Sequence, residues 1–109
     1  MLQRSYAMKS QNKKGFMVLC ALALLNKEDY YGYDLSVEIS KRIDIADGTV
    51  YPILRKMRND GLVSTYLTDG VGGPPRKYYK ITKSGIGEYK KEKQVWFELV
   101  KDINELLEE

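Results

Sequence analysis

The chain has 109 residues, of which 30% are charged and 43% apolar, a composition typical of one globular domain. One cysteine and no histidine exclude an internal disulfide, a zinc site built from Cys and His, and catalysis by a histidine base. We therefore expect no metal, no cofactor and no enzyme activity. The longest apolar run, residues 16–25, is too short to cross a bilayer, and the first residues lack a signal peptide. We expect a cytoplasmic protein without membrane contact.

The net charge of +3 is distributed unevenly. Residues 1–83 hold fourteen basic and eight acidic side chains, a net of +6, whereas residues 84–109 hold four and seven, a net of −3. A polyanion is attracted to the first part and repelled by the second.

Two helices are predicted in the first part of the chain. The first, residues 10–25, contains the apolar run and Cys20, which we expect to be buried. The second, residues 31–42, follows a polar break at residues 26–29.

A third helix is predicted from about residue 47 to Asp60, with Asp44 or Asp47 as its N-terminal cap and Gly61 as its stop. Pro52 is acceptable there only in or near the first turn. The buried face is predicted from apolar residues at i, i+3, i+4 and i+7, which are Val50, Ile53, Leu54 and Met57.

Residues 62–67 and 77–81 are rich in β-branched and aromatic side chains and predict two strands. Residues 68–75, between them, hold three glycines and two prolines, which favours a hairpin with a long loop.

A last helix, capped by Thr82 and weakened at its start by Gly85 and Gly87, is predicted to residue 107. Its apolar seam is spaced 4, 3, 4, 3 and 4, with one polar interruption, and consists of Tyr89, Lys93, Trp96, Val100, Ile103 and Leu107. So apolar a helix needs a partner, either its own domain or a second subunit. We expect a homodimer joined by the five members other than Lys93.

Helix, helix, short turn, helix, hairpin, helix is the order of a winged helix-turn-helix. The expected fold class is thus mainly α (α+β), with a two-stranded wing and a C-terminal dimerisation helix. The third helix suits the major groove of duplex DNA. The candidate DNA contacts on it and on its basic surroundings are Lys13, Lys14, Thr49, Tyr51, Pro52, Arg55, Lys56, Arg76 and Lys77. The alternative is that these are ordinary solvated side chains and that the hairpin is a plain turn.

Four motifs in order resemble the PadR family of bacterial transcriptional regulators, in its subgroup with a single C-terminal helix. They are Tyr31-Gly32-Tyr33-Asp34-Leu35, residues 48–54 with their Tyr-Pro, residues 60–63, and residues 73–82. The resemblance implies a DNA-binding domain over residues 1–83 with Tyr33 among its contacts, and a dimerisation helix over residues 84–109. It further implies binding of double-stranded DNA at an inverted repeat, usually with repression.

The resemblance also gives Trp96 a second interpretation, because some small regulators of this kind stack flat aromatic drugs on a tryptophan of the last helix. Lys93, Phe97 and Val100 would then line the site of a small aromatic effector in a multidrug sensor. The alternative is that Trp96 only packs the dimer seam. A rival to the whole interpretation is a winged-helix protein-interaction module that does not bind DNA.

Overall fold

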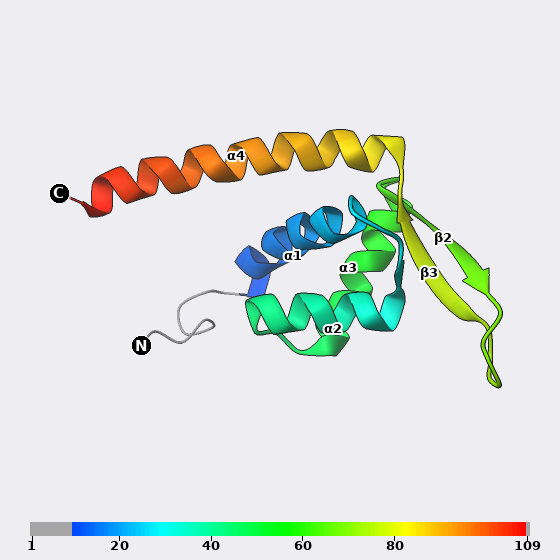
Figure 1. Ribbon diagram of the computed structural model, residues 1–109. Helices are drawn as coiled ribbons and strands as arrows, with labels where there is room; N and C mark the ends of the chain where they lie inside the picture. The colour runs from blue at the N-terminus through cyan, green and yellow to red at the C-terminus, as the bar shows by residue number, and fades with distance from the viewer. Residues whose placement is uncertain (1–9, 109) are drawn as a thin grey trace.

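The computed structural model describes residues 10–108, with the backbone alone for residues 10–13 and Asp47. In chain order its elements are α1 (Ser10–Leu25), β1 (Tyr30–Tyr31), α2 (Gly32–Ile43), α3 (Asp47–Asn59), β2 (Val63–Thr68), β3 (Arg76–Ile81) and α4 (Lys83–Leu107). Figure 1 shows α1, α2 and α3 gathered beside a small sheet, with α4 running along α1. The expected winged helix fold is confirmed.

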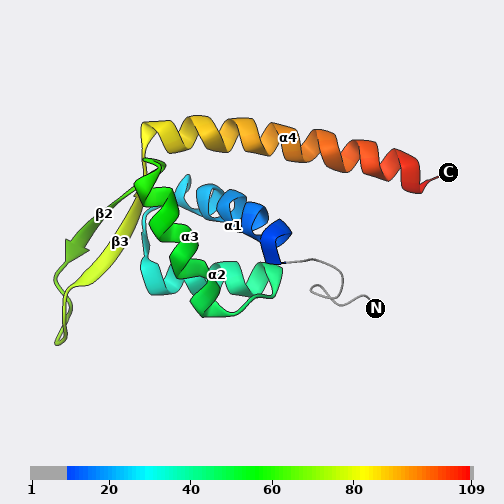
Figure 2. The same ribbon diagram turned by 180° about the vertical axis from the view of Figure 1, so that it is seen from behind.

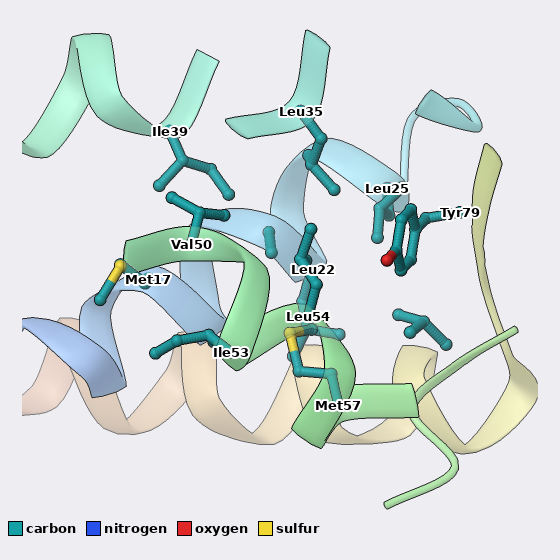
Figure 3. Close-up of a cluster of buried hydrophobic side chains, with 12 residues drawn as sticks. Met17, Leu22, Leu25, Leu35, Ile39, Val50, Ile53, Leu54, Met57 and Tyr79 are labelled. Carbon is teal, nitrogen blue, oxygen red and sulfur yellow. The ribbon is translucent and has the colours of Figure 1, made fainter. Parts of the chain in front are cut away.

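The core lies between the first three helices and the sheet. The buried apolar side chains are Met17, Ala21, Leu22, Leu25, Leu35, Ile39, Val50, Ile53, Leu54, Met57, Val63 and Tyr79 (Figure 3). The predicted buried face of α3 is therefore confirmed in all four positions. Cys20, expected to be buried, is only half-buried, at the edge of this cluster.

The start of α3 corrects one prediction. Neither aspartate caps the helix, because the capping residue is Ala46, which is extended and makes no side-chain hydrogen bond. Asp44 instead ends α2 in the left-handed conformation, with φ of 51°, and its N–H donates to the Ser40 carbonyl at 3.0 Å. Asp44 closes α2 and lies two residues before the capping position of α3, so it does not cap that helix.

The end of α3 is as predicted. The N–H of Leu62 donates to the Met57 carbonyl at 2.9 Å and that of Gly61 to Arg58 at 3.0 Å, while Gly61 has φ of 78°. This is a Schellman motif, in which the two hydrogen bonds close around a residue in the left-handed conformation. Glycine is favoured at that position because it has no Cβ. Pro52 is the sixth residue of the helix, just past the first turn, so the Gly48 carbonyl has no amide donor there.

The sheet has three antiparallel strands in the order β1-β3-β2. The predicted hairpin is present, and it projects away from the helices (Figure 2). The third strand, β1, was not predicted, since two residues are too few to show alternation. Tyr31, predicted to begin the second helix, pairs instead with Tyr78.

Thr82 caps α4 as predicted, accepting the N–H of Gly85 at 3.0 Å and donating to the Gly61 carbonyl at 2.6 Å. Gly85 does more than weaken the helix start. A Cβ at this position would fall on the carbonyl oxygen of Leu62, so only glycine allows α4 to pass so close to the chain before β2. Within residues 10–108, no helix is both long and apolar enough to cross a membrane.

Candidate nucleic-acid interface

A groove of about 380 Å³ opens between the start of α2, the outer face of α3 and strand β3. Five predicted DNA contacts line it: Tyr33 from α2, Tyr51 and Arg55 from α3, and Arg76 and Lys77 from β3. Tyr51 is half-buried and the other four are exposed. Residues distant in sequence therefore converge on one accessible surface beside α3.

The groove is cationic. Arg55, Arg76 and Lys77 line it, and none of the described lining residues is acidic. The three cations form no ion pair with any residue in the range 10–108. The Arg76 guanidinium lies 4.9 Å from the centre of the Tyr31 ring, a cation–π contact that holds it at the rim. Unpaired cations in this position can neutralise phosphates.

Three other predicted contacts lie on the opposite flank of α3. Lys14, Pro52 and Lys56 line a more apolar groove of about 420 Å³ between α1 and α3. Lys56 is ion-paired with Asp60 at 2.9 Å, so part of its charge is already neutralised. The predicted contacts are thus divided between two flanks.

Two predicted contacts remain. Thr49 is half-buried near the start of α3. Lys13 lies outside the described side chains.

The apolar seam of α4 has two parts. Tyr89 packs against the core of its own chain, and the Trp96 ring meets Phe16 of α1 edge-on at 5.2 Å. The C-terminal part of α4 extends past the start of α1 (Figure 1), and there Ile103 and Leu107 are 43% and 75% exposed. The far part of the seam therefore remains available to a second molecule.

The side chains around Trp96 differ in their surroundings. The Lys93 ammonium lies 5.5 Å from the centre of the Tyr89 ring, Phe97 is exposed and Val100 is half-buried. Trp96 itself is 37% exposed despite its contact with Phe16.

A sequence profile of the Transcriptional regulator PadR-like family matches residues 21–91. The chain belongs to this family. The structure of a PadR-like transcriptional regulator from Bacillus cereus is similar, with 34% identity and a TM-score of 0.81, over 92% of this chain and 99% of that one. A PadR-like transcription factor from Bacteroides fragilis has 36% identity and a TM-score of 0.75, over 89% and 95% of the two chains. A protein of Lysinibacillus sphaericus, named only as uncharacterized protein X, is 32% identical over 100 residues, 88% of this chain and 91% of that protein.

This PadR-like fold also assembles a row of tyrosines that the sequence pattern does not predict. Tyr31, Tyr78 and Tyr66 lie side by side across the three strands, with ring centres 6.0 and 5.7 Å apart. The Tyr66 hydroxyl donates to the Asp29 carboxylate at 2.6 Å, and this hydrogen bond raises the pKa of Tyr66. Alternation along β3 sends the next residue, Tyr79, to the opposite face, where it is buried. The row depends on the register of the three strands, and the residue pattern alone does not fix that register.

Proposed function

We propose that this PadR-like regulator is a repressor that binds duplex DNA as a homodimer. The observation that carries the proposal is the convergence of Tyr33, Tyr51, Arg55, Arg76 and Lys77 on one cationic groove beside α3. Family membership supports it, because PadR-like regulators generally bind DNA. In this interpretation α3 enters the major groove, and the hairpin follows the adjoining backbone or minor groove.

The homodimer is supported by the exposed apolar surface of α4 beyond Trp96. A single chain leaves this surface in water, and a second copy would bury it. Residues 1–83 then serve as the DNA-binding unit and residues 84–109 as the dimerisation helix. A two-fold dimer matches a DNA site with two-fold symmetry, so the target is an inverted repeat.

The test is equilibrium binding to labelled duplexes that tile the region upstream of the gene for this chain. Tyr51→Ala and Arg55→Ala should each weaken binding by about 1–3 kcal/mol if the residue reads a base. Lys90→Ala, which removes one exposed charge from α4, is the matched control and should change binding little. A Tyr51→Ala, Arg55→Ala double variant that binds as tightly as the parent contradicts the assignment of α3.

The rival function is a winged-helix module that binds protein alone. It predicts that the parent chain binds no duplex of the tiling set even at low salt, where phosphate contacts are strongest.

We also propose that Trp96 binds a flat aromatic effector that releases the DNA. More than a third of the Trp96 surface is exposed, with Phe97 and Lys93 nearby on α4. An indole offers a broad apolar face to stacking ligands and attracts cationic ones. The chain has one tryptophan, so emission during titration with planar aromatic compounds reports on this side chain directly. Unchanged emission across the panel would leave Trp96 as a packing residue against Phe16.

A further inference from the structure

The floor of the groove beside α3 holds a largely buried tyrosine whose hydroxyl has no hydrogen-bond partner in the described part of the chain. Tyr79 of β3 is 6% exposed and belongs to the core cluster, where Figure 3 shows it at the edge, yet it also lines the groove. Its hydroxyl forms no hydrogen bond with any residue in the range 10–108. The hydroxyl oxygen is nevertheless not sealed in the core, because among the described residues the buried side-chain polar atom without a partner is Ser40 Oγ. An accessible hydroxyl without an internal partner can donate to a group that occupies the groove.

The start of α2 lies directly against the same tyrosine. Gly32 approaches it so closely that a Cβ would stand 3.0 Å from Cε1 of Tyr79, the ring carbon next to the one that bears the hydroxyl. Tyr31, the capping residue of α2, makes no side-chain hydrogen bond to the first turn, so the amides there have no side-chain acceptor. Asp34, the acidic residue of that turn, lines a different groove with Glu38 and Lys41.

The charges around the Tyr79 hydroxyl favour an anion. Burial raises its pKa, while Arg58 and Arg55 oppose that shift, so at neutral pH the hydroxyl keeps its proton and donates. Lys77 and Arg76 complete the rim. Uncapped helix amides, a hydroxyl donor and cations together form the kind of site that binds phosphate groups in proteins.

We propose that the Tyr79 hydroxyl and the first-turn amides of α2 together bind one phosphodiester of the DNA backbone, with Lys77 supplying the charge. This inference rests on the proposed function, since its ligand is duplex DNA. It assigns the floor of the groove to positioning of the duplex, and leaves base contacts to the exposed residues of α3. Contacts to phosphate fix the register of a protein on DNA without reading its sequence.

The experiment is a mutant cycle between the protein and single phosphates. The tightest duplex of the tiling set is synthesised with one neutral methylphosphonate at a time along each strand. Each duplex is titrated with the parent, with Tyr79→Phe, with Lys77→Gln and with Tyr78→Phe. Tyr79→Phe keeps the buried ring, and thermal unfolding checks that it folds. Lys77 is exposed, so its substitution maps the same phosphate without risk to the core. Tyr78→Phe removes a hydroxyl from the other face of the same strand and serves as the control.

We expect Tyr79→Phe to weaken binding about tenfold for each head bound, and Tyr78→Phe to leave it unchanged. At one phosphate in each half-site, the methylphosphonate should abolish the effects of both Tyr79→Phe and Lys77→Gln, because the shared partner is gone. At all other positions the effects should multiply. If the parent binds DNA and Tyr79→Phe binds equally well, this site is wrong and the proposed function is intact. The same holds if Tyr79→Phe causes the same loss of binding at every methylphosphonate. A parent that binds no duplex overturns both.

Discussion

Shortening two side chains at the far end of α4 tests the homodimer directly. Ile103→Ala combined with Leu107→Ala removes apolar groups that are 43% and 75% exposed, together slightly more than one whole side chain in water. Burying such a side chain contributes about 2 kcal/mol. A two-fold interface uses each residue twice, so the dimer should lose about 4 kcal/mol, which raises its dissociation constant by roughly a thousandfold. The folded protomer should lose much less, because these groups face solvent.

Sedimentation equilibrium over a wide concentration range measures this change. Lys101→Ala combined with Glu105→Ala is the control, since both side chains are exposed, the net charge is unchanged, and the helical spacing places them opposite the seam. The control should dimerise like the parent. A parent that sediments as a monomer, or an Ile103, Leu107 double variant with the dissociation constant of the parent, would refute the assignment of α4.

Three further predictions concern stability. Thr82→Ala should lower the free energy of unfolding in urea by about 1 kcal/mol, because it removes the cap of α4 and the bond to the Gly61 carbonyl. Gly85→Ala should cost more, about 2 kcal/mol or above, since its Cβ would meet the chain at Leu62; equal losses for the two variants would contradict the close approach. Burial raises the pKa of the Cys20 thiol, with Arg42 opposing, so the unfolded chain releases this proton first. The contribution of Cys20 is complete below the ordinary thiol pKa of about 8.5 and is lost as pH rises through the folded value. The unfolding midpoint of the parent should therefore fall more steeply above about pH 8.5 than that of Cys20→Ala, and parallel slopes would count against this.

The elements that the sequence predicted correctly are those with local signals. The end of α1 at Leu25 matches the prediction, because a polar break follows the apolar run there. Thr82 and Gly61 act where predicted, since a cap and a left-handed stop depend only on their own few residues. The α3 face is equally local, as four residues at helical spacing must share one side.

The features that the sequence did not predict, strand β1 and the groove, depend on contacts between residues that are distant in the chain. Strand β1 exists only because β3 pairs with it, and its two residues carry no pattern of their own. The same pairing brings the start of α2 to β3, which creates the groove and places Tyr79 under Gly32. The ion pair between Lys56 and Asp60 could have been predicted from the sequence, because side chains four residues apart on a helix lie close together.

Under the proposed function, the placement of the groove accounts for the separation of charge along the chain. Figure 1 shows α2 and α4 on opposite sides of the molecule, with α1 between them, and the groove begins at the start of α2. Arg55, Arg76 and Lys77 of the basic segment line the groove, whereas the acidic excess of residues 84–109 belongs mainly to α4. Under the proposed function, a dimer joined through α4 would keep its acidic helices between the two heads and away from the duplex. Repulsion of phosphates by α4 would then be reduced by distance and by salt, whose screening length is about 8 Å at physiological ionic strength. In the proposed dimer, this arrangement makes an acidic α4 compatible with DNA binding, because the two heads carry the contacts to the duplex.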